Sequence, residues 1–160
     1  MCSPNCKVAE RLRAVLDTNI VIDMLHFADP PAHALLGAIE RGILGCFTDQ
    51  HCLSELERVI AYPQFGLASP AQQALLARYR NLATLCEAGG EENYSLPRCR
   101  DADDQKFLIL GMRCRADLLI TRDRRLLQLA RQRRLPLPFV IVTASAASGL
   151  IAESPTAAIA

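Results

Sequence analysis

Near its amino end the chain reads Ala14-Val15-Leu16-Asp17-Thr18-Asn19, a short apolar run that stops abruptly at polar residues. Such a run predicts a buried strand that ends in a turn. The pattern returns later in the chain, where Leu118-Leu119-Ile120 is followed by Thr121-Arg122-Asp123. Both strands are apolar at consecutive positions, which is typical of a parallel sheet covered by helices on its two faces.

The segments around these two strands complete a pattern of strands alternating with helices. Some have apolar residues at helical intervals, and others are short apolar runs bounded by turn residues. This alternation predicts an α/β fold, a three-layer α/β/α sandwich with a central parallel sheet. Besides the two strands above, we predict strands at 44–47, 84–87 and 137–142, and helices at 20–27, 32–41, 50–61, 70–83, 101–113 and 123–134.

Length and composition indicate one globular domain. The chain has 160 residues, of which 51% are hydrophobic and 22% are charged, enough for a single buried core. We place this domain at residues 12–143, between a flexible tail at 1–11 and a low-complexity tail rich in Ala and Ser at 144–160. No apolar run is long enough to span a membrane and no apolar leader is visible, so a cytoplasmic protein without membrane association is expected.

Seven cysteines are spread irregularly along the chain. Their odd number and the lack of a C-x-x-C pair favour reduced thiols over a disulfide framework. A zinc site that uses Cys2 and Cys6 is disfavoured because their spacing does not match the usual ligand patterns.

Two carboxylates occupy equivalent places in the predicted sheet. Asp17 directly follows the first strand, and Asp123 follows the strand at 118–120. In an open parallel sheet, ligands bind in the crevice beyond the carboxyl ends of the strands, so these two side chains are expected to meet there. Taken singly, each of them could instead be only a helix cap.

Further acidic residues could join this pair. Asp101, Asp103 and Asp104 open a predicted helix, and because three neighbouring carboxylates repel one another, capping does not account for all of them. Asp104 borders the apolar stripe of that helix and is the expected inward carboxylate. On an earlier helix, Glu55 and Glu57 flank the apolar face about equally, so helical geometry leaves the choice between them open.

Four converging carboxylates suit a hard divalent cation such as Mg²⁺ or Mn²⁺. Bound ions would relieve the repulsion, activate a water molecule and stabilise the leaving oxygen of a phosphodiester displacement. Between Arg98 and Arg134 the chain has eleven basic and five acidic residues, which can form a polyanion-binding face or a solvated Arg-rich helix. The RNA-binding residues expected nearest the acids are Arg122, Arg124 and Arg125.

Four segments, in this order, resemble the PIN-domain nucleases, and within them the branch of toxin components from bacterial toxin–antitoxin systems. The resemblance covers about residues 13–143. The segments are Val15-Leu16-Asp17-Thr18-Asn19, Glu55-Leu56-Glu57-Arg58-Val59-Ile60, Arg100-Asp101-Ala102-Asp103-Asp104-Gln105-Lys106-Phe107-Leu108 and Ala116-Asp117-Leu118-Leu119-Ile120-Thr121-Arg122-Asp123.

The resemblance implies a PIN-like α/β/α fold and a hydrolase that cleaves single-stranded RNA with Mg²⁺ or Mn²⁺. Glu55 is preferred to Glu57 because it aligns with the family's Glu-Leu-x-x-Val pattern. The resemblance also implies a small antitoxin protein that blocks the site, and a homodimer. The positions that match the catalytic, metal-binding acids are Asp17, Glu55, Asp104 and Asp123, with Asp101 and Asp103 as alternative ligands, and the supporting polar residues are Asn19 and Thr121.

Other classes of protein fit less well. A phosphatase with Asp17 as nucleophile would need a second acid where Asn19 stands, and a receiver domain would need a Lys after a late strand. Neither a P-loop nor a G-x-G-x-x-G motif is present, and the three His residues form no triad with an elbow Ser. Asp23 is interpreted as structural. The leading alternative is a catalytically inactive PIN-like module that binds RNA or protein, although such a module has no physical need for every acidic position.

Overall fold

The computed structural model describes residues 11–131 and 134–154. Residues 1–10 of the predicted amino-terminal tail at 1–11, with Cys2 and Cys6, and the last residues, 155–160, lie outside the described residues. Five strands form one sheet in which every neighbouring pair is parallel, in the order β3-β2-β1-β4-β5. The strands are β1 (Leu12–Leu16), β2 (Leu44–Thr48), β3 (Ala83–Leu85), β4 (Leu118–Ile120) and β5 (Val140–Val142).

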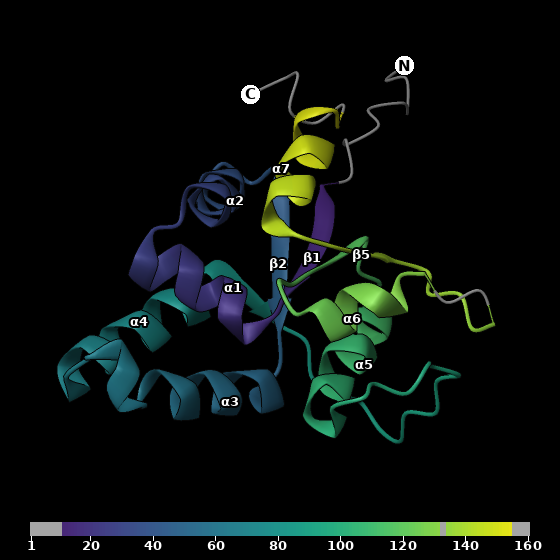
Figure 1. The fold of residues 1–160 in the computed structure, drawn as a ribbon, viewed down its shortest axis with the longest axis horizontal. Helices are drawn as coiled ribbons and strands as arrows, with labels where there is room; N and C mark the ends of the chain where they lie inside the picture. The colour runs from purple at the N-terminus through teal and green to yellow at the C-terminus, as the bar shows by residue number, and fades with distance from the viewer. Residues whose placement is uncertain (1–10, 132–133, 155–160) are drawn as a thin grey trace, which may run out of the picture.

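Helices cover both faces of this sheet (Figure 1), which confirms the predicted three-layer α/β/α sandwich. One face packs against α1 to α4 and α7, and the other packs against α5 and α6. The helices are α1 (Thr18–Ile22), which continues into the π-helical η1 (Asp23–Phe27), α2 (Pro30–Glu40), α3 (Gln50–Ile60), the 3-10 turn η2 (Pro63–Phe65), α4 (Ser69–Leu82), the 3-10 turn η3 (Ala102–Asp104), α5 (Gln105–Arg113), α6 (Arg124–Leu129) and α7 (Ala144–Ala152).

The alternation of side chains between the two faces explains the continuous apolar runs in the two central strands, β1 and β4. In β1, Leu16 points into the core beneath the larger group of helices, whereas Val15 joins the core beneath α5 and α6. In β4, Ile120 and Leu119 divide between the same two cores. A strand that is buried on both faces has no solvent-facing position for a polar side chain, so polar residues begin only where the strand ends.

The order of the strands places a switch in direction between β1 and β4. The chain builds β2 and β3 on one side of β1 and then crosses to β4 and β5 on the other side. Leu16 pairs with Ile120 in the register of these two central strands, and the Asp17 main-chain N–H donates to the Ile120 carbonyl at 3.0 Å. The residues that follow both strands therefore emerge at one level, beside the crevice that such a switch creates.

The end of the domain differs from the sequence-based prediction. Residues from 144 onward were predicted to form a tail, but Ala144–Ala152 is helix α7, which lies beside α2 (Figure 1). Ala147 and Ile151 are buried there, and the hydroxyl of Thr143 accepts the main-chain N–H of Ala146 at 3.2 Å as an N-cap. Small Ala side chains favour helix and allow close packing, so the composition here reflects a packed helix and the tail prediction was wrong for these residues.

The Arg-rich helix is also shorter than the prediction of 123–134. Helix α6 begins at Arg124 and ends at Leu129, and residues 132–133 lie outside the described part of the chain. Within the described ranges, no helix is long and apolar enough to cross a bilayer.

Candidate active site

Asp17 and Asp123 are held together at the carboxyl ends of β1 and β4 by one hydroxyl group. The Thr121 Oγ1 donates to Asp17 Oδ2 at 2.6 Å and accepts the main-chain N–H of Asp123 at 3.0 Å. Thr121 is fully buried and Asp17 is 4% exposed. The Asp123 Oδ1 accepts the main-chain N–H of Arg125 at 2.7 Å, so this carboxylate also caps α6. Thr121 is therefore a positioning residue for both acids.

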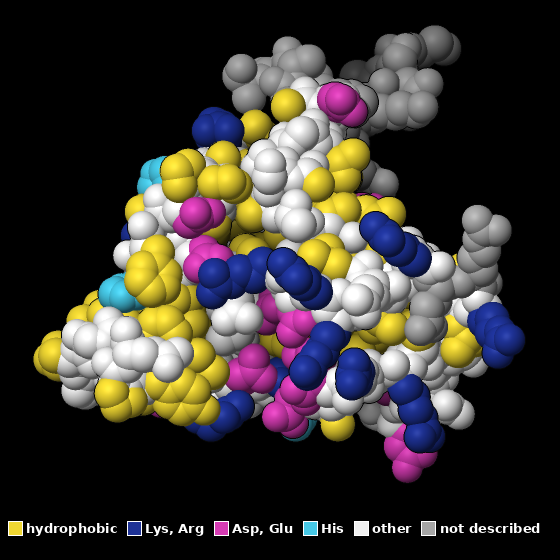
Figure 2. Space-filling view, viewed as in Figure 1, with side chains coloured by type: hydrophobic (Ala, Val, Ile, Leu, Met, Phe, Trp, Pro, Cys, Tyr) yellow, Lys and Arg dark blue, Asp and Glu magenta, His cyan; other side chains and the backbone are white. Residues whose placement is uncertain are grey.

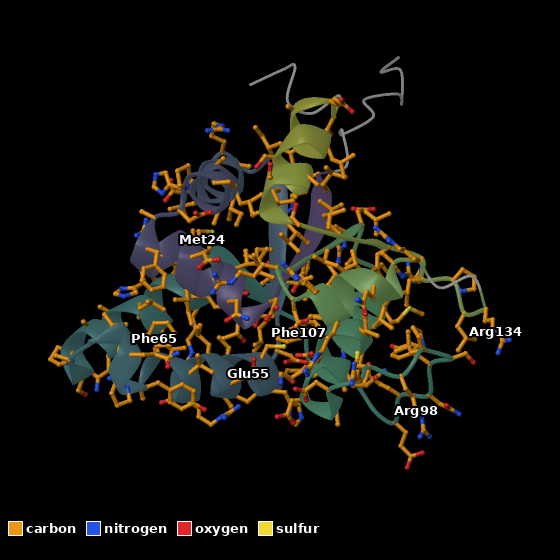
Figure 3. The ribbon with its side chains drawn as sticks, viewed as in Figure 1. Met24, Glu55, Phe65, Arg98, Phe107 and Arg134 are labelled. Carbon is orange, nitrogen blue, oxygen red and sulfur yellow. The ribbon has the colours of Figure 1, made fainter. Side chains whose placement is uncertain are left out.

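Glu55 approaches this pair from α3, which lies below the sheet in Figure 3, where Glu55 and Phe107 of α5 are labelled near each other. Its Oε1 accepts the hydroxyl of Thr18 at 2.7 Å, and its Oε2 forms an ion pair with Lys106. Glu57 is exposed on the same helix. Helical geometry alone could not distinguish the two glutamates. In the structure, Glu55 lies on the side of Asp17 and Glu57 faces solvent.

The acidic turn at the start of α5 supplies the third carboxylate. Asp101 caps the turn, because its Oδ1 accepts the main-chain N–H of Asp103 at 3.0 Å. Asp101 and Asp103 are exposed, whereas Asp104 is half-buried at the junction of η3 and α5. This distribution agrees with the expectation that Asp104 is the inward member of the three.

The electrostatics show that the acids of these separate segments share one region. Burial raises the pKa of Asp17, and this effect is opposed mainly by the Thr121 hydrogen bond and by the main-chain N–H of Asn19. The pKa of Asp104 rises from 3.8 to about 6, first through burial and then through repulsion by Asp17, by Asp101 and by two further acids, Asp123 and Glu55. Because Asp17, Asp123 and Glu55 all act on the pKa of Asp104 from distant parts of the sequence, these carboxylates lie in one region.

A second ion-pair group fixes the base of α3 and the loop that precedes η3. Asp49 caps α3 by accepting the main-chain N–H of Cys52 at 2.8 Å. The guanidinium of Arg113 contacts Asp49 Oδ2 at 2.8 Å and forms two hydrogen bonds of 2.7 Å with Glu92. Arg113 and Asp49 have side chains only 12% and 2% exposed, so this bidentate contact ties α3 and α5 to the loop in a fixed geometry.

Basic side chains border the acidic cluster. Figure 2 shows acidic side chains between the two groups of helices, with Lys and Arg side chains on either side of them. Arg122, Arg124 and Arg125 are exposed, as expected for residues that contact a polyanion. Arg122 also approaches Asp23 at 3.4 Å, a contact that fits the structural interpretation of Asp23.

Comparison with known protein families gives a match: residues 13–125 match the family model of the PIN domain. The chain belongs to the PIN-domain family. PIN domains are generally nucleases, which are hydrolases. The match does not distinguish the toxin–antitoxin branch from other PIN domains. No curated protein and no solved structure matches the chain.

The metal expected for a PIN domain fits this site by the chemistry of its donors. Carboxylate oxygens from Asp17, Glu55, Asp104 and Asp123 suit Mg²⁺ or Mn²⁺. The pKa of Asp104 is raised first by burial and then by neighbouring acids, and a divalent ion would relieve that repulsion. In the described ranges, however, no three His, Cys, Asp or Glu side chains are arranged to hold one ion. The donors are therefore gathered in this PIN domain without being in a ligating arrangement.

The sequence analysis missed two contacts at the site of this PIN domain. Thr18 follows Asp17 directly, and its hydroxyl reaches across to Glu55. Lys106 lies two residues after Asp104, and its ammonium group binds the same Glu55. A Lys next to an acidic cluster was a usable signal, but its partner is 51 residues away in the sequence. Asn19 was expected to support the site; its main-chain N–H lowers the pKa of Asp17, and the supporting role of its side chain stays a prediction.

Proposed function

We propose that this PIN domain is an endoribonuclease that cleaves single-stranded RNA with the help of Mg²⁺ or Mn²⁺, and that it acts as the toxin of a toxin–antitoxin pair. The observation that carries the proposal is the convergence of the acids: the Thr121 hydroxyl links Asp17 to the main chain of Asp123, and Glu55 binds Thr18 beside Asp17. The pKa of Asp104 is raised first by burial and then by repulsion from these acids. A stable fold gains nothing from such repulsion, so the arrangement is best explained by a function that uses it.

Each residue of the site has a definable part in this proposal. Asp17, Glu55, Asp104 and Asp123 would hold the ion, which, when bound, supplies an activated water and a charge that stabilises the leaving oxygen. Thr121 keeps Asp17 and Asp123 in a fixed relative orientation through its two hydrogen bonds. Arg122, Arg124 and Arg125 lie exposed beside the acids and would contact RNA phosphates.

The test is cleavage of a labelled single-stranded RNA in the presence of Mn²⁺, with EDTA as the metal-free control. Asp17→Asn and Glu55→Gln should each lose cleavage by at least about a hundredfold, because each removes a proposed ligand. Glu57→Gln is the matched control, since Glu57 is exposed on the same helix, and it should cleave as the wild type does. Equal cleavage by all four proteins would refute the assignment of the site.

One observation favours a second candidate, a catalytically inactive module that binds RNA or protein. Both oxygens of Glu55 already have partners within the chain, Thr18 and Lys106. If the wild type binds single-stranded RNA but cleaves none with Mn²⁺ or Mg²⁺, this second function replaces the first. The small antitoxin and the homodimer stay predictions, which co-expression with a neighbouring gene product and sedimentation would test.

A further inference from the structure

The site of this PIN domain contains a basic residue, Lys106, in contact with one of its acids. Its Nζ binds Glu55 Oε2 and also donates to the main-chain carbonyl of Asp103 at 2.7 Å. The same ammonium lies 5.1 Å from the centre of the Phe107 ring. These three contacts, with a carboxylate, a carbonyl and an aromatic ring, hold the ammonium group in place. Lys106 therefore has a fixed position at the start of α5, unlike a freely moving surface lysine.

The pairing gives both oxygens of Glu55 a partner within the chain. Oε1 accepts Thr18 at 2.7 Å and Oε2 is covered by Lys106, and the two charged side chains are only 15% and 20% exposed, respectively. Among the ion pairs within the described residues, this is the single one that involves any of the four proposed metal ligands. The positive charge that the cluster requires is therefore supplied, in part, by the chain itself.

We propose that Lys106 is a resident counter-cation that a divalent ion must displace from Glu55, so that this lysine sets how tightly the site binds metal. The inference rests on the metal requirement of the proposed function. It also accounts for a finding that the proposed function leaves unexplained, namely that the acids are gathered without a ligating arrangement. With Lys106 on Glu55, one of the four donors faces an ammonium group in place of an ion.

The direction of the effect follows from competition between two cations for one carboxylate. Replacing Lys106 by Met keeps most of the length of the side chain and removes its charge, so the Lys106 ammonium no longer competes for Glu55 or repels a bound ion. Binding of Mn²⁺, measured by titration calorimetry with manganese chloride, should become about tenfold tighter, which corresponds to a Coulomb effect of one charge at a partly exposed site. Lys106→Gln should behave in the same way and serves as the second neutral variant.

Two further variants separate this proposal from a general effect of charge. Arg58 lines the same surface depression as Lys106 and Glu55, but its guanidinium donates to the Tyr62 hydroxyl at 2.7 Å. Arg58→Met should therefore leave the affinity for Mn²⁺ unchanged. In a Glu55→Gln background the tenfold gain from Lys106→Met should disappear, because the competition takes place at that carboxylate.

Several outcomes would overturn the inference. Unchanged or weaker Mn²⁺ binding by Lys106→Met, with loss of RNA binding, would make Lys106 a phosphate contact. An equal gain in Arg58→Met, or a gain that persists in the Glu55→Gln background, would show a diffuse electrostatic effect. These results would leave the proposed function intact if the wild type binds Mn²⁺ and cleaves RNA. Absence of Mn²⁺ binding by the wild type would refute both proposals.

Discussion

Replacing Asp104 by Asn should stabilise the metal-free protein and destabilise the metal-bound one relative to the wild type. In the wild type this carboxylate is half-buried, and its pKa is raised from 3.8 to about 6 by burial and by neighbouring acids. Asn has nearly the same shape and no charge. The substitution therefore removes the cost of burying a charge, together with the repulsion, while it keeps the packing at the junction of η3 and α5.

The size of the effect can be worked from the shift in pKa. The step from 3.8 to about 6, at about 1.4 kcal/mol for each pKa unit, corresponds to about 3 kcal/mol of unfavourable interaction in the ionised state. Because Asp104 is only half-buried, solvent screening reduces this figure, and we expect about 1–2 kcal/mol. The gain in the free energy of unfolding should have this size when Asp104 is fully ionised.

The sign depends on pH in a defined way. A carboxyl group whose pKa is higher in the folded chain than in the unfolded chain favours folding when it is protonated. The stabilising contribution of Asp104 is therefore complete below pH 3.8 and is lost as the pH rises through about 6. Asp104→Asn should thus equal the wild type near pH 4 in EDTA and exceed it by about 1–2 kcal/mol near pH 8.

Urea denaturation at both pH values, with EDTA and then with saturating Mn²⁺, measures these differences. With Mn²⁺ the order at the higher pH should reverse, since the wild type gains binding free energy that Asp104→Asn has largely lost. Asp103→Asn is the matched control, because this exposed residue lies one position earlier on the same turn. Equal stability of Asp104→Asn and the wild type in EDTA at both pH values would refute the argument that the ionised Asp104 carboxylate is destabilised by burial and by its acidic neighbours.

Two predictions concern the framework that positions the site. Arg113→Met should lower the free energy of unfolding by about 3–5 kcal/mol, because it leaves Asp49 and Glu92 without their cation. A loss below about 1 kcal/mol in urea denaturation would contradict this prediction. Gly111→Ala should cost about 1–3 kcal/mol, since its Cβ would meet the buried Phe139 ring at 2.8 Å, while the control Gly89→Ala meets nothing within 4 Å. Similar denaturation midpoints for the two Ala variants would show that the ring yields freely.

Some features of the fold and of the site could be predicted, because each is determined by a short stretch of sequence. The apolar runs at 14–16 and 118–120 indicate strands that are buried on both faces, and each is followed at once by polar residues. Asp17 and Asp123 could therefore be assigned to the carboxyl edge of a parallel sheet from local pattern alone. The acidic cap of η3, the turn that leads into α5, was predictable for the same reason, because capping joins residues two or three positions apart.

Other features could not be predicted because they depend on the packing of distant segments. Glu55 and Glu57 flank the apolar face of α3 equally in the sequence, and only the docking of that helix against α1 and α5 makes one of them face Thr18 and the other face solvent. The packed helix α7 was missed for a related reason. Its Ala-rich composition is ambiguous until a partner helix, α2, provides the surface that buries it.

By itself, the sequence determined the layers of the sandwich, the parallel sheet and the level at which Asp17 and Asp123 leave it, because these follow from hydrophobic periodicity and from where that periodicity stops. The tertiary structure decided that the Thr121 hydroxyl links these two acids and that Glu55 is held by Lys106. Both outcomes are contacts between side chains brought together by the register of strands and the docking of helices. A contact of this kind depends on distance in space, which no local pattern of residues encodes.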